Sequence, residues 1–175
     1  MVPVTTVSNV LSEEDFVNFV EQIEESDLEF RQEYPKRLFS SPKHQDWLRE
    51  VFGDFVASTA MPYCNAKALQ QIFIGYELPV SWFSLHRSHP AIAGVAVISL
   101  DDFTGVTLNC LTDSFDNPDD YLWGQGEYKS ENFEFFENSA IIVKNTDPRY
   151  HWGFSGNTGA NQIKRSVWIY LGKEP

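Results

Sequence analysis

The sequence predicts a mainly β domain, a sandwich or barrel, with two helices on its N-terminal side. From residue 66 onward, short apolar or alternating runs are separated by turn residues, which is typical of such a domain. Two amphipathic segments precede this region, and no internal repeat or Pro/Gly/Ser-rich linker divides the chain. We therefore expect one domain over residues 1–175, made of a helical flank at 1–62 and a β core at 66–172.

The first helix is predicted over Glu13–Glu25. Ser12 is a favourable N-cap residue, and Asp15 at the third helical position suits the positive end of the helix dipole. Leu11 is placed to pack onto Phe16 across the start of the helix. Apolar residues then recur on one helix face, at Phe16, Val17, Phe19, Val20 and Ile23.

The second helix is predicted to begin at Ser41-Pro42, because a serine cap followed by proline is a common helix start. We expect it to end near Ala57. One face of it is apolar, at Trp47, Leu48, Val51, Phe52 and Phe55. Packing of both helices against a sheet explains these apolar faces better than a groove for a partner protein.

The β core is predicted to contain about eight strands. Their expected ranges are Leu69–Tyr76, Val80–His86, Ala93–Leu100, Val106–Leu111, Tyr128–Phe136, Ala140–Lys144, Tyr150–Phe154 and Lys164–Leu171. The connection Thr112–Gly126 is polar and too long for a tight hairpin. It is either a lid over a site or a surface loop.

Composition excludes several classes of function. A net charge of −12 disfavours binding to nucleic acid, which depends on clustered lysine and arginine. Cys64 and Cys110 are isolated, so neither a zinc ribbon nor a redox motif is supported. The chain shows no signal peptide and no apolar run long enough for a membrane span, so we expect a cytoplasmic protein. Its oligomeric state is open.

The histidines narrow the search for a site, because the chain has only 4 of them, at positions 44, 86, 89 and 151. His86 closes one predicted strand, and His151 lies in another. A single strand histidine is usually a satisfied polar residue. Two that face into one barrel, however, can hold a transition metal through neutral imidazole nitrogens.

A basic residue completes an ordered pattern, because Arg165 follows 14 residues after His151 and opens the last predicted strand. The stretches Leu85-His86-Arg87-Ser88, His151-Trp152-Gly153 and Lys164-Arg165-Ser166 together resemble the iron- and 2-oxoglutarate-dependent oxygenases, most of all their small phage and marine-bacterial members. The likeness covers roughly residues 66 to 172. It implies a double-stranded β-helix, the jelly-roll, cupin-like fold.

The resemblance also implies the cofactors and the role of each residue. His86 and His151 would bind Fe(II), and Arg165 would bind the distal carboxylate of the cosubstrate 2-oxoglutarate. A guanidinium suits that role because it stays charged and grips a carboxylate through two parallel hydrogen bonds. Tyr76 or Asn109 on neighbouring strands would help to hold the oxo-acid, although filling of the barrel explains both residues equally well. The alternative for Arg165 is a salt bridge at the surface or the barrel mouth.

The chain departs from the family pattern at Ser88, which stands where the family places its acidic iron ligand. Ser88 permits a halogenase-like or a two-histidine hydroxylase site in which another ligand fills the vacant position. A different carboxylate, Asp101 or Asp102, could instead reach the metal. In the third interpretation, the barrel has lost its redox chemistry and kept only binding.

Two further alternatives concern register and cosubstrate. His89-Pro90-Ala91 would read as a halogenase-type motif, but Pro90 breaks strand pairing, so we prefer His86. Val167 stands where some families carry a second carboxylate-binding hydroxyl. The sequence thus favours an Fe(II)- and 2-oxoglutarate-dependent oxygenase. The alternatives are a non-catalytic jelly-roll binding or structural protein and a cupin-like metalloenzyme without 2-oxoglutarate.

Overall fold

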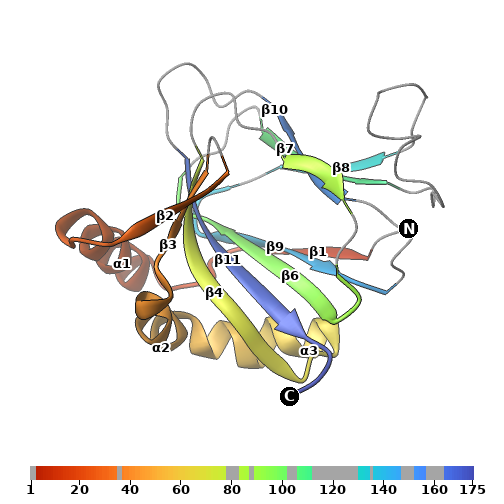
Figure 1. Ribbon diagram of the computed structural model, residues 1–175, viewed down its shortest axis with the longest axis horizontal. Coiled ribbons are helices and arrows are strands. Elements are labelled where there is room, and N and C mark those ends of the chain that lie inside the picture. The colour runs from red at the N-terminus through yellow and green to blue at the C-terminus, as the bar shows by residue number, and fades with distance from the viewer. Residues whose placement is uncertain are drawn as a thin grey trace.

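Two β-sheets face each other, and helices cover the outer face of the larger one (Figure 1). The computed structural model describes residues 3–34, 37–77, 83–86, 89–101, 106–111, 130–134, 136–146, 152–156 and 164–175. For several strand residues, among them His86 and Asn109, only the backbone is described. None of the helices in these ranges is long and apolar enough to cross a membrane.

Helix α1 spans Glu13–Glu25, which confirms the predicted range. The Ser12 hydroxyl accepts a hydrogen bond from the backbone N–H of Asp15 at 3.1 Å, so the cap that defines the helix start is formed. Phe16, Phe19 and Ile23 are buried along one face. The apolar stripe therefore fixes which side of α1 lies on the rest of the protein.

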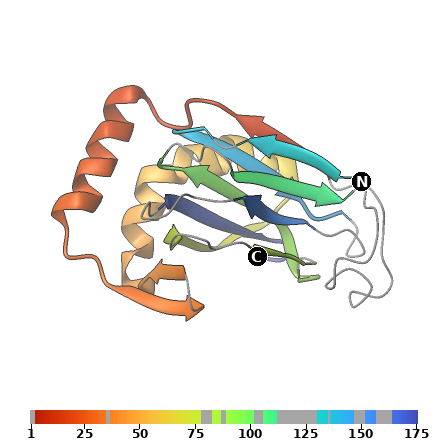
Figure 2. The same cartoon turned by 90° about the horizontal axis from the view of Figure 1, so that it is seen from above.

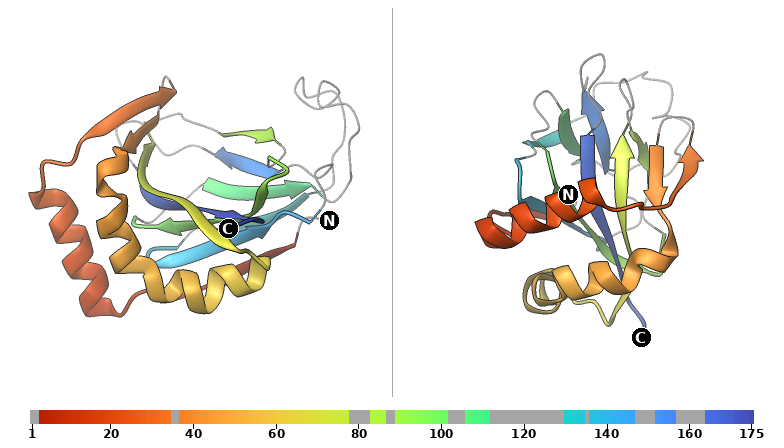
Figure 3. Two further views of the ribbon diagram at one scale, coloured as in Figure 1. Left: turned by 60° about the horizontal axis from the view of Figure 1, so that its bottom comes forward. Right: turned by 90° about the vertical axis from the view of Figure 1, so that its left-hand side faces the viewer.

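The second helical segment is longer than predicted. It begins with the 3₁₀ turn η1 (Pro42–His44) after the Ser41 cap and continues as α2 (Gln45–Phe55). It then passes through the π-helical turn η2 (Val56–Ala60) into α3 (Met61–Cys64). The expected end near Ala57 is wrong. Ala60 and Cys64 are also buried, and their packing stabilises the helical segment beyond that point. Figure 3 shows this segment lying beneath the sheet.

The larger sheet has 7 strands in the order β1-β9-β6-β11-β4-β3-β2. Its central strands are apolar on both faces, because one face meets the helices and the other meets the second sheet. The strands of this sheet are β1 (Val4–Val7), β2 (Phe30–Tyr34), β3 (Arg37–Ser40), β4 (Ala68–Glu77), β6 (Ile92–Ser99), β9 (Ser139–Lys144) and β11 (Lys164–Gly172).

The smaller sheet has 4 strands in the order β5-β10-β7-β8. They are β5 (Phe83–His86), β7 (Val106–Leu111), β8 (Ser130–Glu134) and β10 (Trp152–Gly156). From β4 to β11, successive strands alternate between the two sheets, except that β7 and β8 are neighbours in the smaller sheet. The strand pairings within the described residues are antiparallel. This is a double-stranded β-helix with flanking helices, which confirms the predicted fold class (Figure 2).

The first 62 residues are not a purely helical flank. They also contribute β1, β2 and β3, which extend the two edges of the larger sheet. Strand β1 pairs with β9, and β3 pairs with β4. These strands have only 4 or 5 residues, and two of them carry charged side chains, so they lack the apolar alternation that predicts a strand.

Two apolar layers hold the fold together. The outer layer lies between the helices and the larger sheet and includes Phe52, Ile72, Ile98, Ile142 and Ile169. The inner layer lies between the two sheets, where Phe133 from β8 packs against the cluster that contains Val95, Val97, Ile141, Val143 and Trp168. Because strand side chains alternate, neighbouring residues of a central strand contribute to opposite layers, as Val167 and Trp168 do.

Candidate functional site

The backbone register brings the regions of both predicted iron ligands to one end of the smaller sheet. Strand β5 ends at His86, whose antiparallel partner on β10 is Trp152. Trp152 also pairs with Cys110 on β7. His151 precedes Trp152 in the chain but lies outside the described residues, as does Ser88. The predicted metal ligands therefore stay predictions, with their neighbouring strands paired as that prediction requires.

The other two histidines have local structural roles. His44 Nε2 accepts a hydrogen bond from the backbone N–H of Glu29 at 3.1 Å. His89 Nδ1 accepts one from the backbone N–H of Ala91 at 3.1 Å, within the turn that leads into β6. His89 is also exposed, and its carbonyl accepts from Ile92 N–H. These contacts explain His44 and His89 without a metal, which leaves His86 and His151 as the pair of interest.

Arg165 lies at the start of β11 with its guanidinium held by two carboxylates. Its Nη2 donates to Asp101 Oδ1 at 2.8 Å, and its Nε donates to Asp101 Oδ2 at 3.1 Å. Its Nη1 donates to Glu24 Oε1 of α1 at 3.3 Å. The hydrogen bonds that Arg165 donates to Asp101 raise the pKa of Arg165 above its ordinary value. The salt bridge that the sequence left open for Arg165 is therefore formed.

Asp101 is engaged through both of its carboxylate oxygens. Besides the guanidinium, its Oδ2 accepts the backbone N–H of Arg165 at 2.8 Å. It follows the end of β6, and its side chain is only 23% exposed. Both carboxylate oxygens of Asp101 therefore bind Arg165, whereas the sequence had left open a role as a metal ligand. Asp102 lies outside the described residues.

Tyr76 and Asn109 lie on different sheets. Tyr76 is the cross-strand partner of Arg165 on β4 and packs on the helix-facing apolar layer. Its ring contacts Phe30 edge-on, with centroids 4.5 Å apart, and burial raises the pKa of its phenol. Asn109 pairs with Gly153 of β10 and with Asn132 of β8, and its side chain is outside the description. A cosubstrate role for either residue stays a prediction.

The inner face of the larger sheet is lined by neutral and aromatic groups near Arg165. Ser166 and Trp168 are buried there, and Trp168 Nε1 donates to Ser166 Oγ at 2.9 Å. The rings of Trp168 and Tyr170 stack with centroids 6.4 Å apart, and Phe73 stacks on Tyr170.

The described residues can be compared with the groups that an iron ion and 2-oxoglutarate would each need. Neutral imidazoles are suitable donors for Fe(II), and the backbone of His86, one of the two predicted ligands, lies at a paired strand end. Among the described residues, however, no group of three metal-binding side chains comes together. For the distal carboxylate of 2-oxoglutarate, the predicted partner Arg165 already binds two carboxylates. At Arg165 the described contacts therefore do not fit 2-oxoglutarate.

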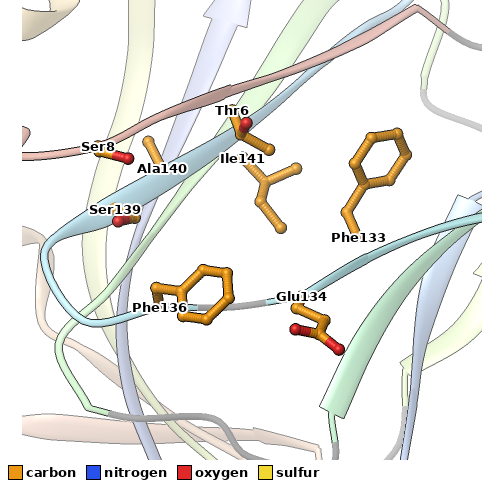
Figure 4. A pocket seen from close by; sticks show the side chains of 8 residues that line it. All are labelled: Thr6, Ser8, Phe133, Glu134, Phe136, Ser139, Ala140 and Ile141. Atoms are coloured by element: carbon orange, nitrogen blue, oxygen red, sulfur yellow. The ribbon is translucent and has the colours of Figure 1, made fainter.

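A surface cavity, which the sequence did not predict, opens beside β1, β8 and β9 (Figure 4). Its volume is about 340 Å³. Phe133 and Ile141 face its interior, and Phe136 at its rim is 60% exposed. The sequence of this region contains three phenylalanines, at positions 133, 135 and 136, among polar residues. The cavity is lined by Thr6, Ser8, Phe133, Glu134, Phe136, Ser139, Ala140 and Ile141.

Solved structures with a similar fold include several oxygenases. One is an oxidoreductase of the 2OG-Fe(II) oxygenase family from Burkholderia pseudomallei, with a TM-score of 0.66 and 10% identity over 98% of this chain and 84% of that chain. Another is HygX from Streptomyces hygroscopicus with nickel and 2-oxoglutarate bound, with a TM-score of 0.69 and 10% identity over 98% and 83% of the two chains.

A third similar structure is a prolyl-4-hydroxylase from Pseudomonas putida, with a TM-score of 0.53 and 9% identity over 98% of this chain and 93% of that chain. The sequence matches no protein-family model and no curated protein. At these identities the structural likeness shows the fold alone. The chain therefore has the double-stranded β-helix fold found in 2OG-Fe(II) oxygenases.

Proposed function

We propose that this protein is an Fe(II)- and 2-oxoglutarate-dependent oxygenase, a hydroxylase or a halogenase-like enzyme. The observation that carries the proposal is the meeting of β5 and β10, where His86 pairs with the residue that follows His151. The oxygenase fold of the solved neighbours supports it as well. When bound, iron with 2-oxoglutarate and O₂ supplies oxidation of a substrate C–H bond, while 2-oxoglutarate is converted to succinate and CO₂.

In this proposal, His86 and His151 hold the metal through neutral imidazole nitrogens, and Ser88 lies beside the position of the missing carboxylate. A serine hydroxyl supplies no negative charge. Two neutral protein ligands leave the cation with more of its positive charge and one more open position than two histidines and a carboxylate do. An anion such as a halide, or water, would then complete the coordination.

One observation favours a second candidate, a non-catalytic jelly-roll binding protein. Arg165 is already paired with Asp101 and Glu24, so the carboxylate-binding group that the oxygenase pattern requires is engaged elsewhere. A protein of this class would keep the barrel without turnover of 2-oxoglutarate. A cupin-like metalloenzyme would lie between the two, with metal bound and no use for the cosubstrate.

An anaerobic titration separates these functions. Fe(II) or Mn(II) is added to the metal-free protein, then 2-oxoglutarate, and binding is followed by calorimetry and by the charge-transfer absorption of an Fe(II) chelate. The oxygenase predicts stoichiometric metal binding followed by cosubstrate binding and slow uncoupled succinate formation in air. Metal binding alone indicates the cupin-like protein, and no metal binding rejects both metalloenzymes.

Matched histidine variants show whether any bound metal is at the proposed site. His86→Ala and His151→Ala are expected to lower metal affinity at least about 100-fold. His44→Ala and His89→Ala serve as controls, because those imidazoles accept hydrogen bonds from backbone N–H groups. Equal losses in all four variants would contradict the assignment. Circular dichroism confirms that each variant is folded before titration.

A further inference from the structure

Arg165 is on the outer face of the larger sheet, which is turned away from the space between the sheets. Strand side chains alternate, and Val167 and Ile169, two and four residues further along β11, are fully buried against the helical layer. The cross-strand partner of Arg165, Tyr76, packs on the same layer. The hydrogen bond to Glu24 on α1 places the guanidinium itself on the helix side.

The inner face of the same stretch carries different residues. Ser166 lies between Arg165 and Val167 and belongs to the opposite face, where its hydroxyl accepts the indole N–H of Trp168. Trp168 is 1% exposed and packs in the inner layer. To bind a carboxylate between the sheets, the Arg165 side chain would have to leave its partners and cross its own strand.

The partners of Arg165 already balance its charge. Asp101 binds it side-on through two oxygens, and Glu24 adds a second carboxylate. The side chains of Arg165 and Asp101 are 17% and 23% exposed, so water screens this pair only partly. A dicarboxylate brought to the same guanidinium would meet two existing negative charges. Its binding there is opposed by charge repulsion as well as by geometry.

The three residues also connect three distant parts of the fold. Glu24 is in the last turn of α1, Asp101 follows β6, and Arg165 opens β11. The backbone of Arg165 takes part too, because its N–H donates to Asp101 and its carbonyl accepts from Leu100 N–H. The cluster continues the β6 to β11 pairing past Ser99 and joins it to α1.

We infer that Arg165 does not bind 2-oxoglutarate in this protein and that it instead anchors α1 and the end of β6 to the start of β11. The inference rests on the sheet face that Arg165 occupies and on its ion pairs, and it is independent of the proposed oxygenase activity. It departs from the role that the family pattern assigns to a basic residue at this point of the chain. Any cosubstrate carboxylate is then bound by another group.

A double-mutant cycle on the metal-free protein tests the anchoring role. Urea unfolding is measured for Arg165→Gln, Asp101→Asn and the double variant. Each single change is expected to lower the folding equilibrium constant about tenfold, and the double variant no more than about threefold further. Lys164→Gln removes the neighbouring positive charge and is expected to show no coupling with Asp101→Asn. Additive effects of Arg165→Gln and Asp101→Asn would overturn the inference.

The ligand arm uses 2-oxoglutarate with Mn(II) and is followed by calorimetry at a temperature where all variants are folded. The Kd of Arg165→Gln is expected to stay within about threefold of the wild-type value. A loss of affinity of about 30-fold or more, without loss of stability, would overturn the inference.

If the wild-type protein binds metal but no 2-oxoglutarate, the inference stands and the proposed oxygenase fails. Should Arg165→Gln not fold while Lys164→Gln does, the anchoring role is supported, and Arg165→Lys replaces Arg165→Gln in the titration.

Discussion

Gly94 on β6 lies so close to Cys64 at the end of α3 that a side chain on Gly94 would overlap the thiol. A Cβ on Gly94 would also lie 2.8 Å from the carbonyl oxygen of Val143, which belongs to the neighbouring strand. The sheet and the helical layer approach each other closely here only because Gly94 has no side chain. We therefore expect Gly94→Ala to destabilise the fold by roughly 2–3 kcal/mol, measured by urea unfolding.

Gly53→Ala is the matched control. Gly53 lies in α2, and a Cβ there would meet no atom within 4 Å. Alanine has the higher helix propensity, so this change is expected to stabilise the protein by about 0.5–1 kcal/mol. Similar effects of the two substitutions would show that the contact between Gly94 and Cys64 is unimportant.

Asn138 joins the turn before β9 to the segment that leads into α1. Its side chain donates to the carbonyl of Leu11 at 2.8 Å and accepts the Leu11 N–H at 3.1 Å. It also has a left-handed backbone conformation, with φ at 55°. Asn138→Ala loses both hydrogen bonds and strains the backbone, so we expect a loss of about 2–4 kcal/mol in the free energy of unfolding.

Asn138→Gly separates the two causes, because glycine adopts the left-handed region without strain. We expect it to be less destabilising than Asn138→Ala by about 1 kcal/mol. Thermal unfolding of both variants gives the comparison. If the glycine variant is the less stable of the two, backbone strain contributes nothing at this position.

Local signals were enough to predict the central elements of the fold. The Ser12 cap and the apolar stripe define α1, and the apolar run Val106–Leu111 coincides with β7. The short strands β1 and β3 were missed because four residues show too little periodicity and gain their stability from a neighbouring strand. Their pairing partners β9 and β4 are far away in the sequence.

The face of β11 that Arg165 occupies could not be predicted from alternation. Val167 and Ile169 are buried on one side and Trp168 on the other, so both faces of the strand are apolar. The pattern therefore does not tell the barrel interior from the helix-facing side. The deciding contacts come from Asp101, 64 residues away, and from Glu24, 141 residues away. Non-local ion pairs leave no periodic signal.

Stability at high pH is expected to depend on Cys64. Burial raises the pKa of this thiol to about 11, with Lys144 opposing the shift more weakly, whereas an unfolded cysteine titrates near about 8.5. Between these values the unfolded chain loses a proton that the folded protein keeps. The stabilising contribution of the buried thiol is therefore complete below about pH 8.5 and is lost as the pH rises toward 11.

Urea unfolding at pH 8 and pH 10.5 measures this effect. We expect the wild-type protein to lose roughly 2 kcal/mol more than Cys64→Ala between the two conditions. The alanine variant serves as the control, because it keeps every other titrating group. Equal pH dependence of the two proteins would show that Cys64 ionises as readily in the folded state as in the unfolded chain.

Ser88→Asp tests whether position 88 is a vacant ligand position of the proposed iron site. An aspartate there would complete a set of two histidines and one carboxylate, which non-haem Fe(II) favours. We expect the affinity for Mn(II), measured by calorimetry, to rise at least about tenfold. Ser88→Asn is the matched control, because it has nearly the same shape and no charge. The gain should disappear when His86→Ala is added to Ser88→Asp, since His151 and the new carboxylate then give the ion two protein ligands, no more than in the wild-type protein. Equal metal affinity of the aspartate and asparagine variants would mean that Ser88 does not adjoin a metal, and the iron site would then have to be sought elsewhere.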